Sequence, residues 1–319
     1  MRVFVAGATG AIGRPLVRRL LAAGHHVTGM TRSPERAAEL RAAGADSVIA
    51  DVFAPGALAE AVGGSRPEVV VNELTDIPRA LDPRKYAEQM KGLERIRAEG
   101  YPNLVRAARD AGARRLVAQS IAFVYAPAGG GAAAAGDAGG HALATEDNPL
   151  WHDAPEPFAT TLGATVAGEQ ATLDSGLEAL VLRYGWFYGP GTSYAADGAM
   201  TAMIRKRRYP IVGRGTGVSS FVHVDDAADA TVAAVESDAT GILNVADDVP
   251  AALRDWLPVV AAMIGAPKPM RVPAFVARVA AGRIAVAFST QQRGAANARA
   301  KAALGWAPAH PTWRGTLGT

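Results

Sequence analysis

The chain begins with Met1-Arg-Val-Phe-Val-Ala-Gly-Ala-Thr-Gly-Ala-Ile-Gly13, and this stretch decides its fold. Residues 2–6 form a short apolar run rich in β-branched and aromatic side chains, which predicts a buried strand. Glycines follow at every third position, and apolar residues then recur at spacings of three and four, which predicts a helix. A strand, a glycine-rich turn and a helix in this order predict a dinucleotide-binding unit.

The three glycines have separate roles in such a unit. Gly7 permits the tight turn, Gly10 lets the backbone approach a pyrophosphate, and Gly13 lets the helix pack closely on the strand. The N-terminus of the helix faces the negative charge. A glycine-rich turn without a ligand is the alternative interpretation. We expect cofactor contacts from the whole turn, namely from Gly7, Thr9, Gly10, Ala11, Ile12 and Gly13.

Further apolar runs alternate with helical patterns along the chain. They predict strands at 26–30, 47–50, 69–72, 116–120, 180–183 and 241–246. The run 69–72 is almost entirely apolar, as in a parallel sheet that is covered on both faces. We therefore predict an α/β fold with a doubly wound, mainly parallel sheet. The predicted division is a Rossmann domain over 1–189, to which 218–248 returns, and a smaller substrate-binding region over 190–217 and 249–319.

The composition excludes several kinds of site. The 319 residues include no cysteine, which rules out disulfides, thiolate metal sites and a cysteine nucleophile. The six histidines show no paired spacing on a helix, so we predict no metal site. A formal net charge of only +3 gives no reason to expect a nucleic-acid partner.

Neither a membrane span nor a targeting segment is predicted. The most apolar late segment, 272–288, is interrupted by Arg278 and Arg283. Met1 leads directly into the first strand, which leaves no room for a signal peptide. We expect a cytoplasmic monomer or homodimer whose partner is a small-molecule substrate.

The end of the second strand predicts the cofactor. An NAD-preferring fold usually has an acid there, which binds the ribose 2′-hydroxyl, but this chain has Thr31-Arg32-Ser33. The guanidinium of Arg32 could clamp a 2′-phosphate with a forked pair of donors, with Ser33 beside it. Glu35 is interpreted as a charge at the start of the next helix. The sequence therefore predicts NADP (as NADPH) rather than NAD, the alternative being that Arg32 is only an exposed side chain.

The glycine spacing Gly-x-x-Gly-x-x-Gly resembles the extended, epimerase-like branch of the short-chain dehydrogenase/reductase superfamily. Two later stretches also resemble motifs of that family, Tyr184-Gly-Trp-Phe-Tyr-Gly-Pro-Gly191 and Ser220-Phe-Val-His-Val-Asp-Asp226. The resemblance implies that Asp51 and Val52 contact the adenine. It implies that Leu74 and Thr75, in the loop after the fourth strand, line the cofactor. It also implies that Tyr184 and Gly185 lie near the nicotinamide. Glu73 is interpreted as a solvated loop carboxylate.

The catalytic Tyr-x-x-x-Lys pair of the family is missing. The corresponding stretch runs from Thr161 to Glu169, so Thr161 replaces the tyrosine and Thr165 replaces the lysine, while Glu169 matches the family's glutamate. The chain therefore resembles an atypical member. A threonine hydroxyl is far too weak an acid to replace a tyrosine near neutral pH.

Two further catalytic positions also differ from the family. Ser120 matches the first serine of its Ser-Ser-x-x-Val-Tyr pattern, but Ile121 replaces the second serine, and Arg97 replaces an asparagine. We expect Thr161 and Ser120 to hydrogen-bond a substrate oxygen or an ordered water. Arg97 either stabilises developing negative charge or forms a structural salt bridge.

Residues 126–157 are unusually rich in glycine and alanine. Such a tract buries little apolar surface, which predicts either a mobile lid over the substrate or a loose surface insertion. Trp151, His152 and Phe158 at its end either touch the substrate or anchor the loop.

The sequence thus predicts an NADPH-dependent reductase that transfers hydride to a ketone of a small or aromatic substrate, including the polyketide type, without a catalytic tyrosine and lysine. One alternative is a non-catalytic NADP-binding regulator or scaffold. Another is a non-redox isomerase or dehydratase that keeps a bound cofactor.

Overall fold

Seven parallel strands form the central sheet of the computed structural model, which describes residues 1–78, 80–128 and 142–319. Their order is β11-β6-β5-β4-β1-β2-β3, and every neighbouring pair is parallel. The predicted α/β fold with a doubly wound sheet is confirmed. The strands are β1 (Arg2–Ala6), β2 (His26–Thr31), β3 (Asp46–Ile49), β4 (Val69–Asn72), β5 (Arg115–Ile121), β6 (Glu178–Tyr184) and β11 (Gly241–Val245).

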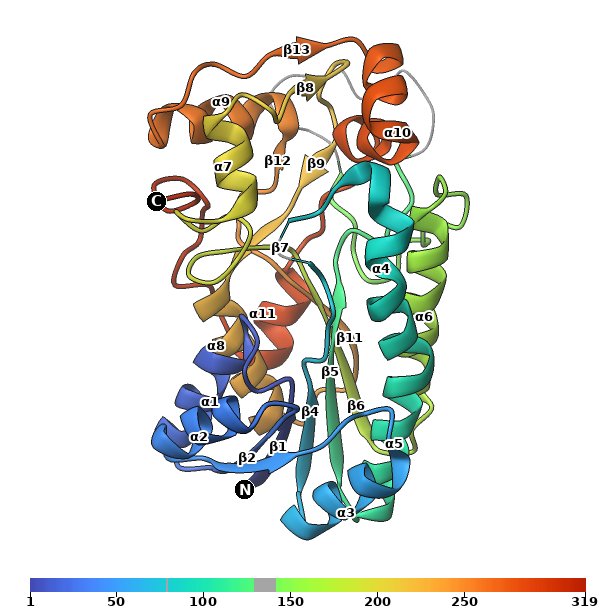
Figure 1. The fold of residues 1–319 in the computed structure, drawn as a ribbon, viewed down its shortest axis with the longest axis vertical. Coiled ribbons are helices and arrows are strands. Elements are labelled where there is room, and N and C mark those ends of the chain that lie inside the picture. The colour runs from blue at the N-terminus through green and yellow to red at the C-terminus, as the bar shows by residue number, and fades with distance from the viewer. Residues whose placement is uncertain (79, 129–141) are drawn as a thin grey trace.

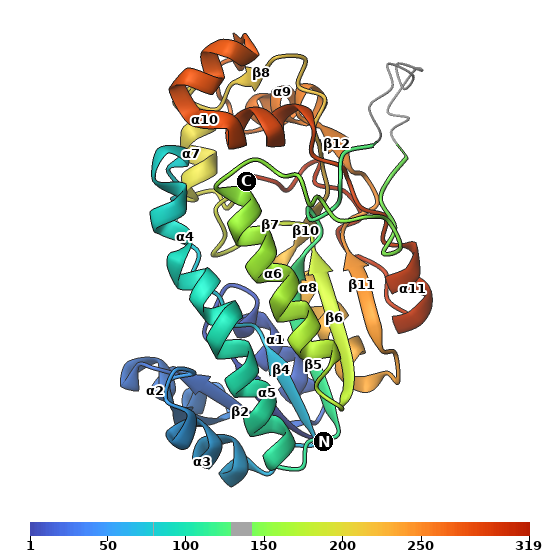
Figure 2. The ribbon, with the colours of Figure 1, turned by 90° about the vertical axis from the view of Figure 1, so that its right-hand side faces the viewer.

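Helices cover both faces of this sheet (Figures 1 and 2). One face carries α1 (Gly13–Ala22), α2 (Pro34–Ala42), α8 (Val224–Glu236) and α11 (Ala298–Leu304). The other carries α3 (Pro55–Ser65), α4 (Tyr86–Arg95), the π-helical turn η2 (Ile96–Gly100), α5 (Tyr101–Asp110) and α6 (Phe158–Leu173). In Figure 2, α4, α5 and α6 lie in front of the sheet.

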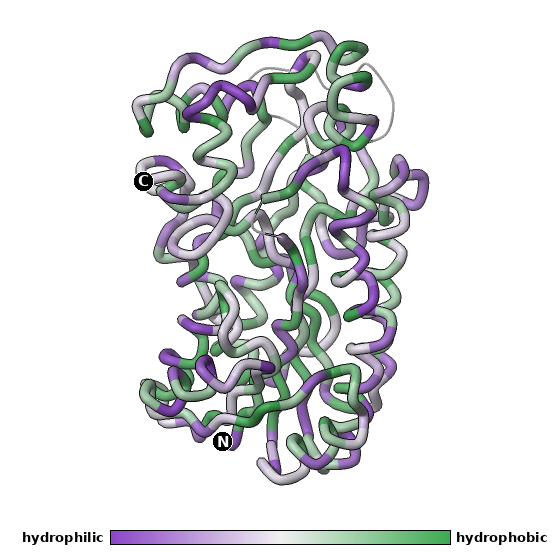
Figure 3. Tube along the Cα trace, in the orientation of Figure 1, coloured by the Kyte–Doolittle hydropathy of each residue, from purple (hydrophilic) through white to green (hydrophobic). Residues whose placement is uncertain are grey.

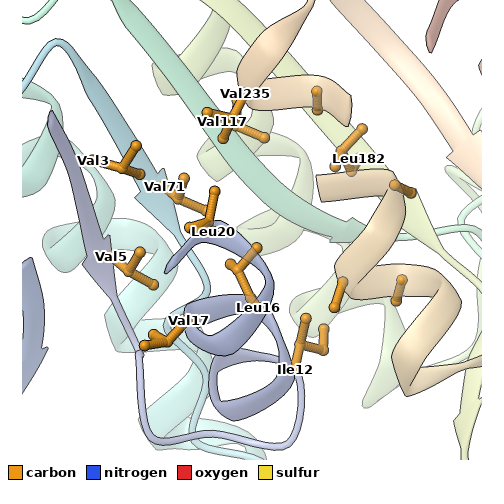
Figure 4. Close-up of a cluster of buried hydrophobic side chains, with 14 of the residues drawn as sticks. Val3, Val5, Ile12, Leu16, Val17, Leu20, Val71, Val117, Leu182 and Val235 are labelled. Carbon is orange, nitrogen blue, oxygen red and sulfur yellow. The ribbon is translucent and has the colours of Figure 1, made fainter. Parts of the chain in front are cut away.

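Alternating side chains of the strands supply two separate cores. Val3 and Val5 of β1 point to the α1 face, whereas Phe4 points to the α3 face, because successive residues of a strand face opposite ways. Figure 4 shows the first core, in which Leu16 and Leu20 of α1 meet the sheet. Hydrophilic residues lie along the outer helices, α4 among them (Figure 3). Burial of each large apolar side chain in the two cores stabilises the fold by about 1.5–3 kcal/mol.

A second region lies beyond the carboxyl edge of the sheet, at the top of Figure 1. Its core includes three aromatic side chains, Phe221, Trp256 and Trp313. It contains three short strand pairs: β7 (Trp186–Tyr188) with β10 (Phe221–His223), β9 (Val218–Ser219) with β12 (Ala251–Ala252), and β8 (Ile211–Val212) with β13 (Arg271–Val272). Its other elements are η1 (Pro83–Lys85), α7 (Ala199–Arg205), α9 (Leu253–Met263) and α10 (Ala274–Thr290).

The predicted division into 1–189 with 218–248 and 190–217 with 249–319 stays a prediction. One part of 249–319 packs elsewhere, because α11 lies against β11 and α8 and contributes Ala300 to the first core. Trp306 belongs to the same core.

The end of the predicted lid is anchored to the protein. Trp151 is buried, and its ring lies edge-on to that of Phe158. His152 is exposed. Ala144 pairs with Ala295 in an isolated bridge. Residues 129–141 of the tract lie outside the described residues, so a lid over 126–157 stays a prediction. Within the described ranges, no helix is both long and apolar enough to cross a bilayer.

Candidate cofactor and active site

The glycine turn and the loop after β4 lie side by side at the carboxyl edge of the sheet. β1 pairs with β4, and the chain order of the sheet reverses between these two strands. The backbone N–H of Glu73 donates to the carbonyl of Ala6 over 2.8 Å, which joins the two loops. Open parallel sheets bind ligands at this kind of reversal.

The packing of the turn requires glycine at two of its three positions. Gly7 has a φ of +88°, and a Cβ there would lie 2.5 Å from the carbonyl oxygen of Glu73. A Cβ at Gly13 would overlap the carbonyl oxygen of Gly7. A Cβ at Gly10 would meet only that oxygen, at 3.3 Å, so the packing alone does not explain this glycine.

The N-terminus of α1 is built to receive a negative charge. Ile12 at its N-cap makes no capping hydrogen bond with its side chain, and the first turn contains no acid. Gly10 and Ala11 are exposed and Thr9 is half-buried, whereas the side chain of Ile12 is buried. Backbone N–H groups at an uncapped helix start are suited to bind a diphosphate. This cradle fits the nicotinamide dinucleotide that the sequence predicts.

The end of β2 leaves one guanidinium free beside a capped helix. Ser33 caps α2 by accepting a hydrogen bond from the Arg36 backbone N–H and donates its own proton to the carboxylate of Glu35 over 2.5 Å. This bond lowers the pKa of Glu35. Arg32 is exposed, and within the described chain its guanidinium has no hydrogen bond or ion pair. Its contact with a 2′-phosphate stays a prediction.

The loop after β3 is tied to α5. The side-chain amide of Asn103 donates to the carbonyl of Val52 over 2.9 Å. Asp51 is half-buried, and its Oδ1 accepts a hydrogen bond from the backbone N–H of Phe53 over 2.9 Å. The second carboxylate oxygen of Asp51 is therefore the one that could accept a hydrogen bond from adenine.

The expectation of a solvated Glu73 is wrong. Its side chain is only 6% exposed, because the alternation of β4 continues for one residue and points Glu73 to the same face as Val71. Burial raises the pKa of Glu73 to about 8. The next residues, Leu74 and Thr75, are half-buried and exposed, which leaves them accessible at the edge of the sheet, as predicted cofactor contacts must be.

Tyr184 is part of the interior of the protein. Its hydroxyl shares a 2.6 Å hydrogen bond with the Thr231 hydroxyl and lies 3.4 Å from the carboxylate of Glu73. Gly185 donates its N–H to the carbonyl of Val245, and a Cβ there would lie 2.6 Å from the carbonyl oxygen of Ser220. The hydroxyl of Tyr184 is thus not available to a ligand, and contacts of the cofactor with Tyr184 and Gly185 stay predictions.

The two threonines that are predicted to replace the catalytic pair use their protons inside the protein. Thr161 is 2% exposed and donates to the carboxylate of Glu94 over 2.6 Å, and Thr165 donates to the carbonyl of Thr161 over 2.8 Å. The Tyr86 hydroxyl also interacts with Thr161, and burial raises the pKa of Tyr86 to about 12. Neither threonine offers a proton to a substrate, and Tyr86 is a weaker acid than a free tyrosine.

Ser120 belongs to a buried ionic network. It donates to Oε1 of Glu169 over 2.5 Å. Arg183 binds the same carboxylate with two nitrogens, Nε to Oε1 at 2.8 Å and Nη2 to Oε2 at 2.6 Å, and its Nη1 donates to the Tyr125 hydroxyl over 3.0 Å. Glu169 therefore joins β5, β6 and α6, and Ser120 can offer a substrate only its lone pairs.

Arg97 is buried and has no hydrogen-bond or ion-pair partner among the described residues. It is 2% exposed, and its guanidinium carbon lies 5.5 Å from the centre of the Tyr101 ring. Its Nε and Nη1 are buried and make no hydrogen bond, and within the described ranges it forms no ion pair. The structural salt bridge that the sequence allowed is thus not formed with any described residue.

Three half-buried aromatic side chains lie together beyond the ends of β5 and β6. The rings of Phe123 and Trp186 stack with centres 4.2 Å apart and an angle of 2° between their planes. Phe288 of α10 meets both edge-on. Sequence reasoning missed this group and Glu94, because the residues come from distant elements. The sequence could have indicated Phe123 as a site residue, because it lies three residues after Ser120. No described group of three or more histidine, aspartate or glutamate residues is arranged to hold a metal.

The family model described as "NAD dependent epimerase/dehydratase family" matches residues 3–246. A relative from Streptomyces sp, the 3-diazoavenalumate denitrifying reductase, is 48% identical over 100% of this chain and 99% of its own length. A second relative, from Stigmatella aurantiaca, is 28% identical over 81% of this chain and 71% of its own length. Its name describes a ketoreductase of a farnesylated dihydroquinoline oxide.

Solved structures show the same fold. The human epimerase family protein SDR39U1 with NADPH has a TM-score of 0.73 and 22% identity, over 100% of this chain and 98% of the other. The UDP-glucose 4-epimerase of Thermus thermophilus with NAD has a TM-score of 0.71 and 24% identity, over 97% and 94%.

Proposed function

The chain belongs to the NAD-dependent epimerase/dehydratase family and is an oxidoreductase; on that premise we propose that it is an NADPH-dependent reductase of a diazo-substituted aromatic acid. In this reaction the bond from carbon to the diazo group breaks, a bond from carbon to hydrogen forms, and nitrogen leaves as N₂. The relative that is 48% identical over the full chain is named for a denitrifying reduction of a diazo carboxylate.

The observation that carries the proposal is the lack of a proton donor at the family's catalytic positions. Thr161 and Thr165 replace the tyrosine and the lysine, and both hydroxyls donate within the protein. The Ser120 hydroxyl is equally occupied by Glu169. A ketone that gains a hydride becomes an alkoxide and needs a proton, so loss of a positioned acid costs about 10²- to 10⁴-fold in rate.

A diazo group is a different acceptor. In its diazonium form it carries a positive charge, and addition of hydride gives a neutral diazene that loses N₂ without a proton from the protein. Bound NADPH would supply the hydride and both electrons of the reduction. The protein then has to bind the substrate, orient it toward the cofactor and exclude water. A site without a general acid can do this.

The residues for cofactor binding follow from the geometry of the carboxyl edge. The uncapped start of α1 would hold the diphosphate, and Asp51 with Val52 would hold the adenine. The unpaired guanidinium of Arg32 supports NADP over NAD, since a phosphate gives it the partner that it lacks. Phe123 and Trp186 offer apolar surface to an aromatic substrate.

Reduction of a ketone is a second candidate, because several relatives are named ketoreductases. It would require a proton from an ordered water or from an acidic hydroxyl of the substrate, with Thr161 and Ser120 only accepting hydrogen bonds.

One experiment separates these candidates. The purified protein is incubated with NADPH and a ¹⁵N-labelled diazo derivative of an aromatic acid, and in parallel with a panel of aromatic ketones. We expect one ¹⁵N₂ released for each NADPH oxidised, faster than in reactions without enzyme, and little turnover of the ketones. Oxidation of NADPH by ketones without release of N₂ from the diazo acid would favour the ketoreductase. No oxidation by either class would leave the regulator, scaffold and isomerase alternatives.

A further inference from the structure

Arg97 is a buried cation that lies over the Tyr101 ring but forms no ion pair and no hydrogen bond with a described residue. Only 2% of its surface is exposed, and neither Nε nor Nη1 makes a hydrogen bond. A buried charge without a counter-charge opposes folding, and proteins normally pair such a group. The unpaired state therefore indicates a group that binds from outside.

The carboxylates of two residues on the neighbouring helices α4 and α6 are already engaged. Glu169 holds Arg183 and Ser120, and Glu94 accepts a hydrogen bond from Thr161. Glu73, another buried carboxyl group, points to the face of the sheet that carries the α1 core, where it interacts with the Tyr184 hydroxyl. Among the described residues, no acid forms an ion pair or a hydrogen bond with Arg97.

The position of Arg97 places it beside the predicted catalytic residues. It lies in η2, a π-helical turn between α4 and α5, and such turns occur frequently at functional sites. Its Cβ would lie 3.5 Å from a Cβ at Gly168, in the middle of α6. The next residue of α6, Glu169, holds Ser120 at the carboxyl end of β5. Arg97 therefore occupies the seam between η2 and α6 at the level of Ser120.

We propose that Arg97 binds the carboxylate of the substrate. A guanidinium can donate two parallel hydrogen bonds to a carboxylate, and such pairs are stronger and more specific than neutral hydrogen bonds. The anion would also supply the counter-charge that Arg97 lacks. This assignment rests on the proposed function for the presence of an acid in the substrate, and it makes Arg97 the residue that selects acids over their neutral derivatives.

The test measures binding apart from turnover. Cinnamate and methyl cinnamate serve as probes, since they have the aromatic acid and its neutral ester but no diazo group. Their dissociation constants are measured by calorimetry in the presence of NADP⁺ for the native protein, Arg97→Gln, Arg97→Lys and Arg109→Gln. Arg109 is an exposed arginine of α5 and is the matched control.

We expect the native protein to bind the acid at least tenfold more tightly than the ester. Arg97→Gln should remove this preference, Arg97→Lys should restore part of it, and Arg109→Gln should leave it unchanged. The affinity for NADP⁺ should stay within about twofold in all variants. The midpoint of thermal unfolding of the ligand-free protein should rise in Arg97→Gln, because an unpaired buried charge has been removed.

Two results would overturn the assignment. One is equal binding of acid and ester by the native protein. The other is a loss of NADP⁺ affinity in Arg97→Gln that equals its loss of acid affinity, which would place Arg97 at the cofactor. Failure to release N₂ from a diazo acid would remove the proposed reaction but not a preference for carboxylates that depends on Arg97, so the two failures are distinguishable.

Discussion

The Thr161 hydroxyl donates a 2.6 Å hydrogen bond to the carboxylate of Glu94, 67 residues earlier in the chain. This bond joins α6 to α4 at the position where the sequence predicts the replacement of the family's tyrosine. Thr161 is therefore a link between helices, and its proton serves the fold.

Replacement of Thr161 by valine should affect activity only modestly. Valine keeps the shape and removes the hydroxyl, so Glu94 loses one donor but the reaction loses no general acid. We expect kcat to fall by about tenfold or less, compared with about 10²- to 10⁴-fold for loss of a positioned acid. The free energy of unfolding should fall by about 1–3 kcal/mol. A thousandfold loss of kcat in a well-folded Thr161→Val protein would show that the hydroxyl takes part in the chemistry.

Replacement of Arg32 by alanine should weaken NADPH binding more than NADH binding. In the proposed complex the exposed guanidinium would pair with the 2′-phosphate, which NADH lacks. We expect the dissociation constant for NADPH to rise by about tenfold, a moderate value because solvent screens an exposed pair. Calorimetry with both cofactors measures the difference, and Arg18→Ala on the exposed side of α1 is the control. Equal losses for the two cofactors would remove Arg32 from phosphate recognition.

Replacement of Glu169 by glutamine should destabilise the protein strongly. Arg183 would keep its buried charge without its counter-charge, which costs about 3–5 kcal/mol. The double variant Glu169→Gln with Arg183→Met should recover part of this loss, because it removes the unpaired charge as well. Urea denaturation of the native protein, the two single variants Glu169→Gln and Arg183→Met, and the double variant measures the coupling energy between the two residues. Additive effects of the two substitutions would mean that the pair is energetically independent.

Glu73 should make stability depend on pH. Its pKa is raised by burial from 4.5 to about 8, so between these values the folded state keeps a proton that the unfolded state has lost. Stability contributed in this way is present below about pH 4.5 and falls as the pH rises toward 8, by about 1.4 kcal/mol per pH unit. Glu73→Gln should remove this slope and should be more stable than the native protein at pH 8.

The check on Glu73 is urea denaturation from pH 5 to pH 8. The difference between Glu73→Gln and the native protein cancels the contribution of Asp247, whose pKa burial raises to about 7. Parallel curves for the two proteins would contradict the raised pKa of Glu73.

The fold could be predicted from the sequence because local patterns specify it. Gly7 and Gly13 mark a turn that only glycine can form, and apolar runs such as 69–72 mark strands covered on both faces. The face to which Glu73 points depends on where β4 stops alternating, which composition does not reveal. A residue that follows a strand is expected to be solvated, whereas Glu73 is the last buried position after β4.

The candidate site could be predicted only in part. The replacements at Thr161, Thr165 and Arg97 are predictions from the sequence. The sequence could not show that no described acid pairs with Arg97, because this depends on every residue that surrounds it in space. The bond from Thr161 to Glu94 and the meeting of Phe288 with Trp186 join residues that no local spacing relates.

The aromatic group of Phe123, Trp186 and Phe288 comes from two different parts of the chain. Phe123 and Trp186 follow strands of the central sheet, whereas Phe288 comes from α10, which contributes none of the residues predicted to hold the cofactor. If the aromatic group contacts the substrate as proposed, we expect substitutions in α10 to change which substrates are accepted without altering the predicted diphosphate site at Gly10. We therefore expect substrate preference to be changeable by substitutions in the C-terminal third of the chain, while the N-terminal part that is predicted to bind the cofactor stays constant.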